Sequence, residues 1–200
     1  MLTRFTQDLS QARLLEPAMD AWYTANGFTV ERNSAVSDQL LGIDVRLQKE
    51  GRTWVVDEKS QLNYIGRSLP TQALELDYLI GAKRHQGWLF DSTKVNEFFT
   101  FVFDIRLRNG ATRFHRHEDL GTFTAVIVER GKLIQALANA GLNESTMDKY
   151  VRELRSTYTR FRSLRYPAVS ITCSKQLAEQ PINLVVHRRF LEALQERLPT

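Results

Sequence analysis

Two aspartates and a lysine lie close together in the segment GIDVRLQKEGRTWVVDEKSQ, residues 42–61. Asp44 lies in one apolar run, and Asp57 and Lys59 end the next run, after a polar turn. Side chains two positions apart on a strand share a face, so Asp57 and Lys59 are expected to point the same way. If the two runs pair as a hairpin, Asp44 lies near the Asp57 end of its neighbour. Carboxylates placed in this way repel each other, and burying either one alone costs several kcal/mol.

A divalent cation would relieve this repulsion. Mg²⁺ prefers carboxylate oxygens and keeps water molecules for the substrate. A cation held here could bind a phosphate oxygen, lower the pKa of a bound water and offset negative charge on phosphorus. Lys59 could orient or activate that water, or stabilise the developing charge. These residue types therefore predict metal-dependent hydrolysis of a phosphate ester, with Mg²⁺ as the metal and Mn²⁺ as its substitute.

The same residues also allow a purely structural interpretation. The tripeptide at 57–59 could be the exposed end of a strand, with ordinary surface charge. Asp44 could accept hydrogen bonds from the following turn, or pair with Arg46 or Arg52. The elements around the segment help to choose between the two interpretations.

Hydrophobic spacing predicts the elements that would position these residues. A helix over 4–25 should carry an apolar stripe and end at Asn26-Gly27, with a kink or break at Pro17. The stripe comprises Phe5, Leu9, Ala12, Leu15, Met19 and Trp22. The expected order is then three strands, a helix and further strands, over 28–33, 41–48, 53–60, 69–84, 86–90 and 98–107.

Asp44, followed by Asp57-Glu58-Lys59 as a D-x-K tripeptide, resembles the motif of the PD-(D/E)XK phosphodiesterase superfamily, the restriction-endonuclease-like nucleases. The resemblance implies an α/β fold with a restriction-endonuclease-like core, α-β-β-β-α-β, in which helices flank a central mixed sheet. We expect one domain, with this core over about 4–107 and a basic C-terminal α/β elaboration over about 108–200. One departure is Ile43, which precedes Asp44 where the family motif has proline.

The resemblance also implies roles for individual residues. Asp44 and Asp57 would be metal ligands, the backbone carbonyl of Glu58 an extra ligand, and Lys59 the catalytic lysine. The reaction would be cleavage of a DNA phosphodiester bond by a metal-activated water, with RNA as a variant substrate. The alternative is a non-catalytic nucleic-acid-binding or scaffold protein on the same fold.

A further acidic residue completes the site in many members of the superfamily. Their first helix supplies a glutamate, for which Glu16 is the candidate, although Pro17 leaves its direction open. Gln61, just after the lysine, and Glu75, on the expected helix over 69–84, are two other residues that could complete the site.

The second half of the chain predicts mixed structure with a basic surface. Strands are expected over 121–129 and 181–186, and helices over 130–141, from Ser145 or Thr146 to 164, and over 187–198. The second of these helices has an apolar stripe of Met147, Val151, Leu154, Tyr158 and Phe161. Its cations lie off that stripe and are predicted to contact DNA phosphates: Lys149, Arg152, Arg155 and Arg162. A solvated basic face would look the same, and a loose helix-turn-helix pattern over 132–154 is a further alternative.

Composition narrows the functional classes. The first hundred residues carry 11 Lys and Arg against 13 Asp and Glu, and the second hundred carry 16 against 10, which favours an anionic partner for the second half. A single cysteine, Cys173, allows no internal disulfide. No glycine-rich phosphate loop and no G-x-S-x-G motif supports nucleotide hydrolysis or serine chemistry.

Cellular context is predicted from what the sequence lacks. No apolar run of about 18 residues predicts a membrane span, and the first residues do not resemble a signal peptide, so we expect a cytoplasmic protein. His115 and His117 are two apart in a loop-like segment, where a surface or phosphate-contacting role is favoured over a metal site. A homodimer, or a partner in a multi-protein DNA-processing or defence system, stays open.

Overall fold

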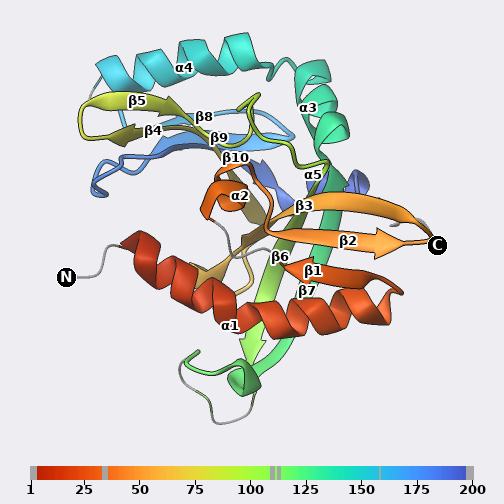
Figure 1. Cartoon of the computed structure of the whole chain (residues 1–200). Coiled ribbons are helices and arrows are strands. Elements are labelled where there is room, and N and C mark those ends of the chain that lie inside the picture. Colours follow the sequence, from red (N-terminus) through yellow and green to blue (C-terminus); the bar gives the residue numbers. More distant parts are fainter. Residues whose placement is uncertain (1–3, 33–35, 109–110, 112–113, 158, 197–200) are drawn as a thin grey trace. The chain divides into compact units, whose positions relative to one another are not determined.

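The chain is a mixed α/β protein in which two compact units are built from alternating segments of sequence (Figure 1). The computed structural model describes residues 4–32, 36–108, 111, 114–157 and 159–196. The first unit comprises residues 1–69, 96–128 and 196–200, and the second comprises 70–95 and 129–195. The expected extension over 108–200 therefore contributes to both units.

The first unit contains a central mixed sheet of five strands in the order β1-β2-β3-β6-β7. Strands β1 (Thr29–Arg32), β2 (Val45–Lys49) and β3 (Arg52–Ser60) form an antiparallel meander. Strand β6 (Phe98–Leu107) then pairs parallel to β3, and β7 (Leu120–Glu129) follows β6 in the sheet. The mixed sheet and these strand positions agree with the sequence-based expectation.

The turn between β2 and β3 sets the register of the hairpin. Lys49 pairs with Arg52, and the two residues between them, Glu50 and Gly51, have φ of 51° and 76°. Two consecutive positive φ values are typical of a type I′ turn, whose twist matches that of the flanking strands. This short turn brings the start of β2 alongside the second half of β3.

Helix α1 (Arg4–Ala25) packs on one face of this sheet (Figure 1). Its buried residues Leu15, Met19 and Tyr23 join a core with strand residues such as Val45 and Val56. The helix runs through Pro17 without a break, so of the two predicted alternatives, a kink or a break, the break is wrong. The predicted helix end is confirmed by Gly27, whose φ is +85°. The side chains of Phe5 and Leu9 lie outside the described residues.

A short helix that the sequence pattern did not predict, α2 (Val36–Leu40), leads into β2. The amide of Ile43 donates to the Asp38 carbonyl at 2.9 Å, and Arg46 on β2 pairs with the Asp38 carboxylate at 3.3 Å. These bonds tie the helix to the start of the strand and so place Asp44 at the entrance of β2.

The second unit contains an antiparallel sheet in the order β5-β4-β10-β9-β8. Its strands are β4 (Thr71–Ile80), β5 (Lys83–Gln86), β8 (Phe161–Ser163), β9 (Ala168–Cys173) and β10 (Ile182–His187). Its helices are α3 (Arg130–Asn139), α4 (Glu144–Ser156) and α5 (Arg188–Ala193). Figure 1 shows α4 lying along this sheet near β4 and β5.

The structure corrects the prediction of a helix over 69–84, which is strand β4 followed by β5. The sequence of this segment fits both periods, because Leu74 and Leu76 alternate with exposed positions at the start. Six residues of β10, about a hundred positions later, pair with β4, and this pairing stabilises the strand over the helix. The strand expected over 86–90 is also wrong, since β5 ends at Gln86.

The connection from β3 to β6 therefore contains β4 and β5, where the restriction-endonuclease-like order would have a helix. The predicted long helix to residue 164 is shorter too. It is capped at its N-terminus by Asn143, whose side chain accepts a hydrogen bond from the Thr146 amide, and it ends at Ser156. Met147, Val151 and Leu154 are buried as predicted, Phe161 is exposed on β8, and Tyr158 lies outside the described residues.

Candidate active site

Asp44 is anchored to strand β3 at both its backbone and its side chain. Its amide donates to the Val56 carbonyl at 3.1 Å, and its carboxylate accepts a hydrogen bond from the Glu58 amide at 2.8 Å. The pairing of β2 with β3 ends at Val45 and Val56, so the side chain of Asp44 takes the place that a strand partner would otherwise occupy. The carboxylate is thereby held beside the D-x-K tripeptide.

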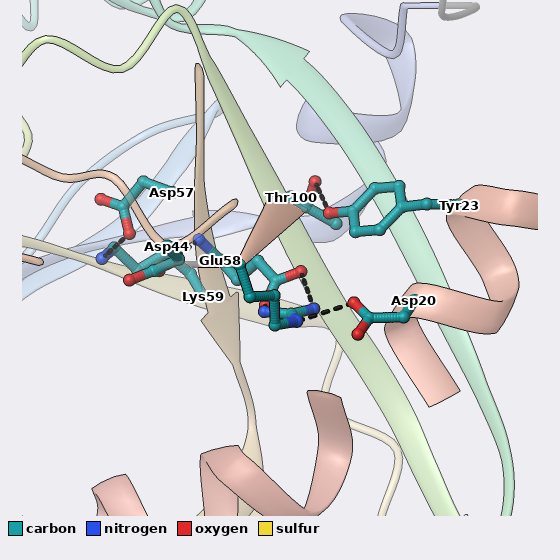
Figure 2. A network of polar contacts seen from close by, with 8 residues as sticks. Asp20, Tyr23, Asp44, Asp57, Glu58, Lys59 and Thr100 are labelled. Atoms are coloured by element: carbon teal, nitrogen blue, oxygen red, sulfur yellow. Dashed lines mark hydrogen bonds and ion pairs between the residues drawn. The ribbon is translucent and has the colours of Figure 1, made fainter. Parts of the chain in front are cut away.

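Asp57 and Lys59 lie on the same face of β3, as the alternation of a strand requires. Asp57 is 2% exposed, and its carboxylate forms an ion pair with the Lys59 ammonium (Figure 2). The Lys59 side chain is 24% exposed, and Asp44 is half-buried. The structure thus brings together the three residues singled out in the sequence, with Lys59 and Asp44 on the accessible side.

The electrostatics of this cluster favour a bound proton or cation. Burial raises the pKa of Asp57 to about 7; Lys59 lowers this pKa, and the neighbouring Asp44 carboxylate raises it. Because the Asp44 carboxylate raises the pKa of Asp57, the two carboxylates lie near each other. A pair of adjacent carboxylates, one of them buried, is more stable when a positive charge lies between them.

The carbonyl of Glu58 points toward the side of β3 on which Asp44 lies. Val56 accepts its hydrogen bond from Asp44 on that side, whereas Val55 accepts from Glu97 on the side of β6. Carbonyl directions alternate along a strand, so the Glu58 carbonyl points the same way as that of Val56. This direction fits the expected role of the Glu58 carbonyl as a third oxygen ligand.

The side chain of Glu58 lies on the opposite face, against α1. Arg32 at the end of β1 donates two hydrogen bonds to the Glu58 carboxylate, at 2.9 and 3.1 Å, and a third to Asp20 on α1 at 2.7 Å. Burial raises the pKa of Glu58, although the contact with Arg32 opposes the shift. Sequence reasoning missed Asp20 and Arg32; the one available signal was two opposite charges on elements otherwise expected to pack a core.

A buried tyrosine completes this second network. Tyr23 donates a hydrogen bond to the Thr100 hydroxyl at 2.8 Å (Figure 2), and Thr100 is the partner of Glu58 in the parallel pairing of β3 with β6. Burial raises the pKa of Tyr23 well above its ordinary value, and the charge of Glu58 adds to the shift. Tyr23 is therefore a neutral hydrogen-bond donor and packing residue beside Glu58.

The other residues expected near the site are placed differently. Glu16 is half-buried on α1, one turn before Asp20, and α1 covers the face of β3 opposite to Asp57 and Lys59. The α1 carboxylate that the structure connects to the motif is Asp20, through Arg32. Gln61 follows β3 directly, and its amide bonds to Val102. Glu75 lies on strand β4 of the second unit, so its expected place on a helix is wrong.

The predicted DNA-contacting cations belong to the second unit. Arg155 forms an ion pair with buried Asp77, and its side chain is 15% exposed. Arg152 pairs with Asp148 at 2.6 Å and is largely exposed, as is Lys149.

Arg162 lies on β8 instead of on the helix, because α4 ends six residues earlier. Its guanidinium pairs with Glu153 at 2.5 Å and lies over the Tyr150 ring, 4.1 Å from the ring centroid. Acidic or aromatic partners on the protein therefore hold three of the four cations, and they compete with phosphate for those three.

The donor set at Asp44 and Asp57 fits a hard cation. Among the described residues, no group of three or more His, Cys, Asp and Glu side chains could hold a metal ion. Two carboxylates and one carbonyl form a smaller set, which suits Mg²⁺ because this ion keeps several water ligands. The two neighbouring carboxylates, one with a pKa raised by burial, supply the negative charge that such an ion would neutralise.

Comparisons with models of known protein families, with curated proteins and with solved structures found no match to this chain. Within the described part of the chain, no helix has the length and apolar character needed to cross a membrane.

Proposed function

We propose that this protein is a metal-dependent nuclease that hydrolyses DNA phosphodiester bonds at the cluster of Asp44, Asp57 and Lys59. The observation that carries the proposal is that the Asp44 carboxylate is bonded to the Glu58 amide, next to the buried Asp57 and its partner Lys59. The resemblance to the PD-(D/E)XK motif supports the same reaction. The proposal includes a restriction-endonuclease-like core in which β4 and β5 stand where that order would have a helix between β3 and β6.

Each residue has a chemical task in this reaction. Asp44 and Asp57, with the Glu58 carbonyl, would hold Mg²⁺ or Mn²⁺, which when bound activates water and offsets negative charge. Lys59 is the accessible cation of the cluster and stabilises the charge that develops on the phosphate as the water oxygen bonds to phosphorus. The bond from phosphorus to the leaving sugar oxygen breaks, and the proton lost by the water ends on that oxygen.

Cleavage of a mixed nucleic-acid panel tests this proposal. Duplex, nicked, branched and single-stranded DNA, together with RNA, are incubated with the full chain in Mg²⁺, in Mn²⁺ or in chelator. We expect metal-dependent cutting that falls at least about 100-fold in Lys59→Met and in Asp57→Asn. Lys49→Met is the matched control, because Lys49 lies on the same sheet but packs over the Phe28 ring.

Two results would count against a nuclease. Cutting that persists in both site variants would come from a contaminating enzyme. Retention of DNA without cutting by any form of the protein would favour the alternative, a nucleic-acid-binding or scaffold protein. In that case binding should weaken steeply with salt and survive Asp57→Asn.

A further inference from the structure

Glu58 is held at two points, by its backbone amide at the edge of β3 toward β2 and by its side chain on the face that packs against α1. Its amide donates a hydrogen bond to the Asp44 carboxylate, and its own carboxylate accepts two hydrogen bonds from Arg32. A carboxylate bound by two parallel N–H groups is fixed in direction as well as position. Both contacts therefore restrict rotation of the two peptide units that flank Glu58, one of which carries its amide and the other its carbonyl.

The register of the sheet explains how Arg32 reaches Glu58 from two strands away. Arg32 is the last residue of β1 and lies opposite Val45, the first residue of β2, which in turn lies opposite Val56. The pairing of β2 with β3 ends at this row, and the Arg32 guanidinium meets the next side chain on the same face of β3, Glu58. Asp20 on α1 binds the remaining edge of the guanidinium.

We propose that Arg32 is a positioning residue for the Asp44–Asp57–Lys59 cluster: by holding the Glu58 side chain, it keeps the backbone of this residue in the orientation in which its carbonyl faces the two aspartates. The metal-directed part of this inference rests on the proposed function. Arg32 touches none of the reacting atoms and acts only through Glu58. Outer partners of this kind keep ligands in direction, and their loss typically weakens metal binding by about 10- to 100-fold.

The test must separate positioning from simple stabilisation. Arg32→Met alone leaves the half-buried Glu58 carboxylate without its arginine, and this variant can fail to fold for that reason. The double variant Arg32→Met/Glu58→Met removes both charges and avoids that penalty. Arg32→Lys keeps a charge but loses the fork. Arg188→Met is the matched control, because Arg188 also forms an ion pair, with Glu192 in the second unit, and its side chain is 20% exposed against 17% for Arg32.

Two measurements on the folded full-length variants decide the matter. Amide hydrogen exchange at position 58, followed by NMR, reports the bond to Asp44, with the Leu47 amide as an internal reference. Titration with Mn²⁺ reports the cation site. We expect exchange at position 58 to be at least 10-fold faster in the double variant and in Arg32→Lys, and Mn²⁺ binding to weaken by about 10-fold or more in both. Arg188→Met should match wild type in both measurements.

The outcomes distinguish this inference from the proposed function. Suppose that the wild type binds Mn²⁺. If the Arg32 variants then keep the wild-type exchange rate at position 58, or the wild-type Mn²⁺ affinity, the positioning role is overturned and the nuclease proposal stands. If exchange at position 58 is faster in the Arg32 variants but the wild type binds no Mn²⁺, the result supports the positioning of Glu58 and overturns the metal site.

Discussion

The tripeptide Asp57-Glu58-Lys59 forms an ion pair on each face of strand β3: Asp57 pairs with Lys59 on one face, and Glu58 pairs with Arg32 on the other. Asp57 is buried beside Asp44 and relies on Lys59 for its counter-charge, whereas Glu58 relies on Arg32. Removing water from a carboxylate disfavours its charged form, and a neighbouring carboxylate adds to that cost. We therefore expect the folding stability of the metal-free protein to depend strongly on pH through Asp57.

The stability of the metal-free protein should fall as the pH rises from about 4 to about 7. The pKa of Asp57 is about 7 in the folded state against 3.8 in the unfolded state, so the folded protein holds this proton more tightly. Its stabilising contribution is complete below pH 3.8 and is lost as the pH rises through 7, a change of about 4 kcal/mol at most. Urea unfolding in chelator, across this range, measures the effect.

Asp57→Asn provides the control for this prediction. The amide cannot titrate, so the component of the pH dependence that Asp57 contributes should disappear, and the difference in unfolding free energy between variant and wild type should vary with pH. A difference that stays constant from pH 4 to 7 would show that Asp57 is not the titrating group.

At the scale of secondary-structure elements, a basic residue of helix α4 has a structural role, because Arg155 pairs with a buried aspartate of the sheet. Arg155 faces the sheet and pairs with Asp77 on β4, and Arg84 on β5 holds the other oxygen of the same carboxylate at 2.8 Å. Asp77 is almost completely buried, so these arginines neutralise a charge that the interior could not otherwise hold. Arg152, three residues earlier, makes only an exposed pair with Asp148 on its own helix.

Arg155→Met should therefore destabilise the protein by about 3 kcal/mol, since Arg84 alone then compensates Asp77. Arg152→Met, the matched control on the same helix, should cost about 0.5 kcal/mol or less. Urea unfolding at neutral pH compares the two. Equal losses in both variants would show that the pair with Asp77 contributes nothing beyond a surface ion pair.

At the scale of the whole molecule, each of the two units is built from segments that alternate along the sequence. Strands β6 and β7 of the first unit follow β4 and β5 of the second unit in the sequence. Strand β4 is fully paired only when β10, about a hundred residues later, lies beside it. Contacts between segments so distant in sequence must form before either sheet is complete.

A fragment of residues 1–107 should consequently lack a cooperative fold, although it contains the whole candidate site. It omits β7, whose residues Val126, Ile127 and Val128 are buried in the first unit, and it omits every partner that β4 has apart from β5. Thermal unfolding followed by circular dichroism, beside the full chain, measures this. A sharp transition in the fragment would mean that the first 107 residues fold on their own.

The sequence alone determined the local part of the site. The alternation of β3 places Asp57 and Lys59 on one face, and the short turn at Gly51 returns the chain so that Asp44 meets them; both depend on residues close in sequence. Helix α1 was predicted for the same reason, because its apolar stripe and its glycine end are local signals.

Only the tertiary structure decided the rest. Residues 71–80 suit a helix or a strand by their spacing, and pairing with β10 selects the strand. The partners of Glu58 and Arg155 come from 26 and 78 residues away, where no local pattern indicates them. Local spacing controls which side chains share a face of an element, whereas the identity of a buried charge's partner depends on how distant segments pack, because burial makes an unpaired charge too costly to leave.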